Sequence, residues 1–116
     1  MNGLIEKIFK DFEVDGVSIP VAFLYYEGHD EPYITYMQMD ADNSYSADNK
    51  LLGYVNYYDF NIYSKGNFTA IIRAVKEKLQ EAGFEWQPSR SSADMYETET
   101  GYYHKTLNFA VFVNEN

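Results

Sequence analysis

The 116-residue chain contains no cysteine, so it forms no disulfide and offers no thiolate for catalysis or metal binding. No apolar run approaches the ~20 residues that a membrane-spanning helix needs. Acids interrupt the N-terminal segment 1–13, and no small-residue cleavage site follows it, which is not typical of a signal peptide. We therefore expect a protein that is made or assembled in the cytosol.

Lysine and arginine are missing from a long stretch between Lys10 and Lys50. That stretch carries nine acids: Asp11, Glu13, Asp15, Glu27, Asp30, Glu31, Asp40, Asp42 and Asp48. Residues 50–116 are nearly balanced, with eight acids and seven bases, and the whole chain has a formal net charge of −9. A field of this sign repels phosphate and disfavours DNA or an anionic membrane as a partner. The acids are either an ordinary solvated surface or an end of the molecule that is acidic for a purpose.

A calcium loop is only partly matched. Asp40, Asp42 and Ser44 occupy alternating positions, as the first ligands of such a loop do. However, Tyr45 stands where the loop needs glycine, and Leu51 stands where it needs the bidentate glutamate. The spacing therefore argues against calcium.

Motifs for other chemistry are also missing. The sequence has no GxSxG, no Walker-type lysine and no GxGxxG. The two histidines, His29 and His104, have no ligand-spaced partner except Glu27 beside His29, and we interpret both as exposed surface residues. We expect no metal, no cofactor and no enzymatic activity, although catalytic pairs can meet in space without a sequence motif.

Hydrophobic periodicity predicts two helices and four strands. Segment 3–13 has an apolar stripe at helical spacing, and Asp15-Gly16 is expected to end that helix. A second helix is expected over 68–83, with Asn67 as its N-cap and Gly83 just beyond its C-terminus. Alternation predicts strands over 19–25, 33–40, 52–63 and 102–113, the first two forming an antiparallel hairpin. The polar segments 40–50 and 87–101 are expected to be loops.

This order predicts one domain over residues 1–116. Each helix has a single apolar stripe to bury, so both helices must cover the same face of the sheet. The expected fold class is α+β: a two-layer sandwich, mostly antiparallel, with the order α-β-β-β-α-β.

The strand over 52–63 is unusually aromatic. Its row Tyr58, Phe60 and Ile62 is expected to be core under the second helix, by periodicity. The opposite row, Val55, Tyr57 and Tyr63, is predicted to be a subunit interface, because tyrosine is enriched where exposed surface becomes interface. A base-stacking surface is disfavoured, because only Lys65 is near and Asp59 lies within the strand.

Two long segments carry a family resemblance. The stretch YDFNIYSKGNFTAIIRAVKEKLQEAGFEW shows a strand, a short break and an amphipathic helix ending at glycine, and ETGYYHKTLNFAVFV is a closing strand after a polar connection. With the leading helix LIEKIFKDF and the hairpin at 19–39, the layout resembles the tail-completion or tail-terminator (head–tail joining) proteins of long-tailed bacteriophages. The resemblance covers nearly the whole chain and rests on element order and apolar patterning.

The resemblance implies a non-enzymatic structural protein of the virion tail, assembled in the bacterial host cytoplasm. Such proteins form a six-membered ring on the end of the tail tube, stop its growth, and offer a docking surface to the head connector. The implied partners are other copies of the chain, the tail-tube protein and the connector protein, with DNA passing through the channel without specific binding and no membrane involved.

An acidic channel would let DNA slide. We therefore expect the loop with Asp40, Asp42 and Asp48 to face the channel or the connector, although it is equally well explained as a solvated loop. An alternative function is a small acidic binding module that inhibits a DNA-binding protein by mimicking nucleic-acid charge. An enzyme is a third alternative.

Overall fold

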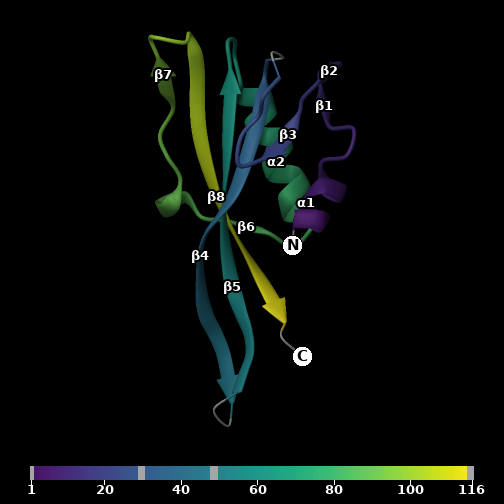
Figure 1. Cartoon of the computed structure of the whole chain (residues 1–116), viewed down its shortest axis with the longest axis vertical. Coiled ribbons are helices and arrows are strands. Elements are labelled where there is room, and N and C mark those ends of the chain that lie inside the picture. The colour runs from purple at the N-terminus through teal and green to yellow at the C-terminus, as the bar shows by residue number, and fades with distance from the viewer. Residues whose placement is uncertain (1, 29–30, 48–49, 115–116) are drawn as a thin grey trace.

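The molecule is organised around one strongly twisted sheet (Figure 1). The computed structural model describes residues 2–28, 31–47 and 50–114. Within them the strand order is β3-β4-β5-β8-β6, and β7 also pairs with β8. The strands are β3 (Val21–Phe23), β4 (Tyr33–Ala47), β5 (Lys50–Ser64), β6 (Glu85–Trp86), β7 (Met95–Glu97) and β8 (Tyr102–Asn114). All neighbours are antiparallel except β3 and β4.

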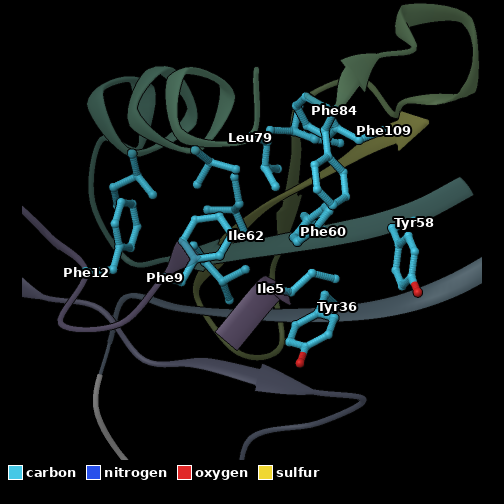
Figure 2. Close-up of a cluster of buried hydrophobic side chains, with 14 of the residues drawn as sticks. Ile5, Phe9, Phe12, Tyr36, Tyr58, Phe60, Ile62, Leu79, Phe84 and Phe109 are labelled. Carbon is cyan, nitrogen blue, oxygen red and sulfur yellow. The ribbon is translucent and has the colours of Figure 1, made fainter. Parts of the chain in front are cut away.

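Both helices, α1 (Asn2–Ile8) and α2 (Thr69–Glu81), pack on the same side of this sheet, which we call the helix face. Figure 2 shows their apolar side chains meeting those of the strands. The other side is called the outer face. The predicted α+β two-layer class, with a mostly antiparallel sheet, is confirmed. The small elements are β1 (Glu13–Val14), β2 (Val17–Ser18) and the 3-10 turn η1 (Pro88–Arg90).

The central strand β5 supplies the middle of the core. Tyr58, Phe60 and Ile62 are at most 2% exposed, which confirms the row predicted to be buried. The fully buried partners of this row come from both helices and the two neighbouring strands: Ile5, Ile34, Val75, Leu79, Leu107 and Phe109. Each such side chain contributes about 1.5–3 kcal/mol by leaving water.

Helix α2 begins and ends close to its predicted signals. The N-cap is Phe68, one residue after the predicted Asn67, but the side chain of Asn67 still accepts a hydrogen bond from the Thr69 amide at 3.0 Å. At the other end, Gly83 has φ +93, and its amide donates to the Gln80 carbonyl. The next amide, of Phe84, donates to the Leu79 carbonyl, and both side chains are buried. This is a Schellman motif, which satisfies the last carbonyls of the helix.

Two predictions for the N-terminal part are wrong. The first helix ends at Ile8, and Asp15-Gly16 does not stop it. Instead both residues have positive φ and form the two-residue turn of the hairpin β1–β2, the strongest local hairpin signal. In addition, β3 and β4 pair in parallel, with Val21 opposite Ile34 and Phe23 opposite Tyr36, and are not the expected antiparallel hairpin.

The predicted loop at 40–50 is also wrong for the residues that the structure describes. Asp40 and Asp42 lie in β4, opposite Tyr57 and Val55 of β5, and β5 itself starts at Lys50. Asp48 lies outside the described residues. Polar composition suggested a loop, but each backbone group of the aromatic strand β5 needs a partner, and β4 supplies it along the whole length.

The long hairpin gives the chain its shape, with principal extents of 52 × 27 × 24 Å. Figure 1 shows β4 and β5 continuing well beyond the helices, so the helix layer covers only one half of the sheet. We call the uncovered half the projecting hairpin. In the described part of the chain, no helix is long and apolar enough to cross a membrane.

The glycine that ends α2 provides a test of the local geometry. A Cβ at Gly83 would meet no atom within 4 Å, so Gly83→Ala creates no steric clash with other residues. Its only energetic cost is the strain of holding alanine in the left-handed backbone conformation. We expect a loss of about 1 kcal/mol in the free energy of unfolding, measured by urea denaturation. Gly3→Ala is the matched control: Gly3 lies in α1, also has open space, and should gain about 0.5–1 kcal/mol. Equal effects of the two changes would contradict this explanation.

Candidate functional site

The outer face carries a row of stacked rings across three strands, which we call the aromatic ladder. Tyr33 of β4, Tyr63 of β5 and His104 of β8 are register partners. The ring centres of Tyr33 and Tyr63 are 4.8 Å apart, and those of Tyr63 and His104 are 4.2 Å apart, both nearly parallel. Tyr26 extends the row beyond Tyr33, and Tyr102 meets Tyr33 and Tyr63 edge-on.

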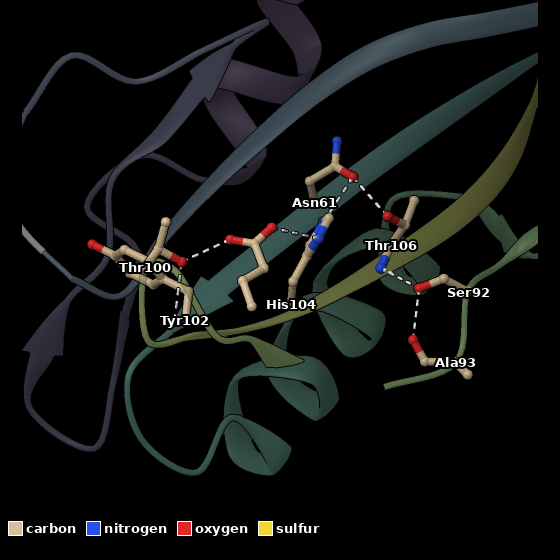
Figure 3. A network of polar contacts seen from close by, with 8 residues as sticks. Asn61, Ser92, Ala93, Thr100, Tyr102, His104 and Thr106 are labelled. Atoms are coloured by element: carbon tan, nitrogen blue, oxygen red, sulfur yellow. Dashed lines mark hydrogen bonds and ion pairs between the residues drawn. The ribbon is translucent and has the colours of Figure 1, made fainter. Parts of the chain in front are cut away.

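A polar network holds the histidine end of the ladder (Figure 3). Nε2 of His104 is 3.4 Å from Oδ1 of Asn61, and the Thr106 hydroxyl donates to that same oxygen at 2.7 Å. On the other side, Nδ1 of His104 is 3.7 Å from a carboxylate oxygen of Glu97 in β7. The second Glu97 oxygen accepts from the Thr100 hydroxyl, so the carboxylate ties the β7–β8 turn to the sheet.

These contacts shift two pKa values. Burial lowers the pKa of His104 below its ordinary 6.5, against the opposing effect of Glu97. Burial, and secondarily Glu97, raises the pKa of Tyr63 above 10.0. The expectation that His104 is an exposed surface residue is therefore wrong, because its side chain is only 16% exposed and lies between a ring and two polar partners. His29 lies outside the described residues.

The middle of the outer face is also polar. Asn108 is 2% exposed and donates from its amide nitrogen to Asp59 at 2.8 Å, while its Oδ1 has no hydrogen-bond partner. Next along the strand, the guanidinium of Arg90 lies over the ring of Tyr57, 3.8 Å from its centre. The side chains of Asp59 and Tyr57 in this region therefore contact specific partners, Asn108 and Arg90, and do not form an uncovered aromatic surface.

The three predicted interface residues lie on the outer face but differ in surroundings. Tyr63 is stacked between Tyr33 and His104, Tyr57 lies under Arg90, and Val55 faces Phe112, which is 53% exposed. All three are half-buried in the single chain. Val55 is thus the one of the three beside a large exposed apolar side chain, and the interface role stays a prediction.

Larger exposed apolar side chains lie at the two edges of the sheet. The β3 patch consists of Phe23, Leu24 and Tyr25, which are 47–66% exposed, and the β7 patch consists of Met95, Tyr96 and Tyr103, which are 41–53% exposed. The rings of Tyr96 and Tyr103 are 4.9 Å apart.

Sequence reasoning missed both patches. Alternation placed Phe23 and Tyr25 on one face of a predicted strand without indicating that they are exposed, and Met95 and Tyr96 were within the segment 87–101, which was predicted to be a polar loop. A signal was nevertheless available for the second patch, because Met95 and Tyr96 are large apolar side chains within the otherwise polar segment 87–101.

The described part of the molecule has several clefts at its surface, lined by both apolar and polar residues. One of about 210 Å³ lies between the β1–β2 hairpin and the start of α2, lined mainly by apolar side chains together with Asp15, Glu31 and Ser64. The Glu31 carboxylate there accepts a hydrogen bond from the Lys65 amide, and Ser64 accepts one from the Gly66 amide. Among the described residues, no group of three or more acidic or histidine side chains is placed to hold a metal ion.

Comparisons with known proteins do not assign the chain. No model of a known protein family matches it, and no curated protein matches its sequence.

The half-buried His104 predicts a pH dependence of stability. Because the folded state binds the His104 proton less readily than the unfolded chain does, the stabilisation is fully present above pH 6.5 and is lost as the pH falls through the lower folded pKa. The free energy of unfolding of the natural protein should therefore decline below pH 6.5 relative to His104→Gln. Urea denaturation between pH 4.5 and pH 8 measures this, with His29→Gln as the control. Parallel profiles for the natural protein and His104→Gln would refute it.

Proposed function

We propose that this chain is a non-enzymatic structural protein that caps the tail tube of a phage or prophage as a ring and forms the head–tail joining surface. The observation that carries the proposal is the position of the two apolar patches. Strands β3 and β7 lie on opposite sides of one sheet (Figure 1), and each carries residues of one patch. Large exposed apolar side chains of this kind mark interaction sites.

Opposite, non-identical patches suit a head-to-tail contact. In such a contact the β3 patch of one copy meets the β7 patch of the next, and the assembly closes into a ring when the rotation between copies allows it. A two-fold dimer would instead use one patch twice and leave the other exposed. The resemblance of residues 54–113 to tail-terminator proteins supports a ring of six.

The projecting hairpin supplies a second surface that ring closure leaves available. It extends beyond the helix layer, so it can contact the tail-tube protein or the head connector while the sheet edges of the wide half contact neighbouring copies. Asp40 and Asp42 belong to this hairpin. We therefore place the acidic segment with Asp40, Asp42 and Asp48 toward the channel or the connector, where it does not retain DNA.

The ring is tested by native mass spectrometry over a concentration series at moderate salt. We expect a six-subunit species that grows with concentration and with ionic strength, because both edges carry acids, including Glu27 and Glu97, whose repulsion salt screens. If the chain closes only on a tube end, the same experiment on purified tail tubes must show six copies per tube. A monomer in both settings, with tight binding to a basic DNA-binding protein, would favour the acidic inhibitor instead.

Two edge variants sharpen this test. Leu24→Asn removes an apolar side chain at a position with φ +68, which asparagine tolerates better than leucine, so folding should be preserved. Tyr96→Asp alters the other edge. Each variant alone should fail to close a ring, and the two mixed should stop at a dimer joined through the remaining intact patches. Leu4→Asn, at an exposed position of α1 outside both patches, should still form rings. Rings from either edge variant would refute head-to-tail contact.

The acidic segment is tested separately. Replacing Asp40, Asp42 and Asp48 together by asparagine should leave ring formation intact, because none of them belongs to either patch. It should reduce the yield of infectious particles in a phage carrying the gene, since DNA passage or connector docking would lose its acidic surface. Unchanged infectivity with unchanged assembly would exclude this role for the three residues.

A further inference from the structure

The cleft of about 210 Å³ beside the β1–β2 hairpin has a buried apolar floor. It lies between this hairpin and the start of α2, at the end of the molecule opposite the projecting hairpin (Figure 1). Ile19, Pro32 and Ile71 line it and are buried, whereas Val17 lines it and remains 47% exposed. An apolar group that enters this cleft would cover Val17 and displace water from an apolar surface, which is favourable.

Two carboxylates lie at the mouth of the cleft. Asp15 and Glu31 both line it, and both are exposed. One oxygen of Glu31 accepts a hydrogen bond from the Lys65 amide at 2.9 Å, and its other oxygen has no partner among the described residues. The Asp15 carboxylate makes no hydrogen bond or ion pair within the described chain. Both acids can therefore still accept hydrogen bonds from a ligand.

The bases of the neighbouring elements do not neutralise these acids. The ammonium of Lys65 lies over the ring of Tyr102, 5.2 Å from its centre. Arg73, one helical turn beyond Ala70 of the cleft wall, is exposed and pairs with neither acid. The segment 11–49, which supplies both acids, contains no lysine or arginine. The mouth of the cleft therefore attracts a cation from outside.

The fold does not account for the two charges. Asp15 and Gly16 form a two-residue hairpin turn with positive φ at both positions, and asparagine suits such a turn as well as aspartate does. The Lys65 amide needs only an oxygen acceptor, which the neutral side chain of glutamine would supply equally. Each acid thus has a structural role that an uncharged amide could fill.

The distribution of polar groups sets the orientation of a ligand. The only polar side chain that is buried among those lining the cleft is Ser64, and its oxygen already accepts a hydrogen bond from the Gly66 amide. An ammonium on the floor would therefore lie away from both acids, whereas an ammonium at the mouth would lie beside them. The volume of about 210 Å³ equals that of roughly seven waters, enough for a short branched chain or a single ring.

We propose that this cleft binds a primary amine with a short apolar body. The body contacts Val17, Ile19 and Ile71, and the ammonium is held at the mouth by the carboxylates of Asp15 and Glu31. A free alkylamine and the N-terminal residue of a peptide both present this chemistry. The proposal goes beyond the ring and does not depend on it, because neither apolar patch contributes a residue to the cleft.

The first probe is isopentylamine, with isopentanol as a control that has the same body and no charge. Binding is followed through the amide signals of Val17, Gly66 and Ala70 in an NMR titration of the natural protein. We expect the amine to bind about fivefold more tightly than the alcohol, the size of effect that two exposed ion pairs give. The difference should shrink as salt is raised.

Matched variants separate the charges from their structural roles. Asp15→Asn with Glu31→Gln keeps the turn and the acceptor for the Lys65 amide, and it should weaken amine binding about fivefold. Asp11→Asn with Glu27→Gln removes the same charge at exposed positions that do not line the cleft, and it should bind like the natural protein. Ala70→Leu fills the cleft from α2 and should abolish binding of both probes, with urea denaturation reporting that the variant is folded.

A peptide distinguishes the two sources of the amine. The tripeptide Leu-Gly-Gly presents a free N-terminal ammonium beside an apolar side chain, and its N-acetylated form does not. Tighter binding of the free tripeptide than of isopentylamine would assign an N-terminal residue as the ligand, and weaker binding would assign a free amine. The acetylated tripeptide should bind no better than isopentanol does.

The proposal is wrong if isopentylamine and isopentanol bind equally, or if the acetylated tripeptide binds as well as the free one. It is also wrong if the Asp15→Asn, Glu31→Gln variant binds the amine like the natural protein, since the carboxylates would then serve only the turn and the loop. Chemical-shift changes confined to residues outside the cleft, or none at all with isopentylamine, would likewise exclude it.

Discussion

The fold depends on one constraint: β5 must be paired on both sides while its even-numbered side chains lie under two helices. Phe60 and Ile62 are fully buried between α1, α2 and the neighbouring strands. Because α2 is only 13 residues long and α1 only seven, the helix layer cannot cover strands of 15 residues. The sheet therefore divides into a covered half, which supplies the hydrophobic core, and a projecting half, which is held together mainly by its ladder hydrogen bonds.

The same constraint explains what could be predicted from sequence. Segments with strong periodicity and a local end signal, such as α2 with Asn67 and Gly83, needed only their own residues and were correct apart from boundaries. Three other features could not be predicted from local residues. The direction of β3 and the extension of β4 through 40–47 depend on partner strands elsewhere in the chain. The signal Asp15-Gly16 can either end a helix or form a hairpin turn, and here it forms the turn between β1 and β2. The polar composition of residues 40–47 could not reveal a strand there, because this segment extends β4 by pairing with the aromatic strand β5.

In the candidate site, too, the features that depend on local residues could be predicted, and those that depend on distant strands could not. Tyr63 could be assigned to the outer face from alternation alone, but its stacking on Tyr33 and His104 required the register of three strands. Likewise, the exposure of Phe23 follows from where the short edge strand β3 stops, which no local pattern encodes. Tyr33, Tyr63 and His104 of the outer face stack on one another, whereas the residues of the β3 patch and the β7 patch remain at least 41% exposed.

A long strand near the edge of a sheet can promote uncontrolled stacking of copies into fibrils, and β3 pairs with β4 only from Ile34 to Tyr36. Strand β4 contains three register irregularities against β5, between Gln38 and Asp40, between Asn43 and Tyr45, and between Tyr45 and Ser46. Each such bulge increases the local twist and bends its strand. Cross-β growth requires flat ribbons that superimpose on identical neighbours. The bulges therefore give the β4–β5 hairpin a curvature that does not superimpose on a flat neighbouring copy, which works against cross-β growth.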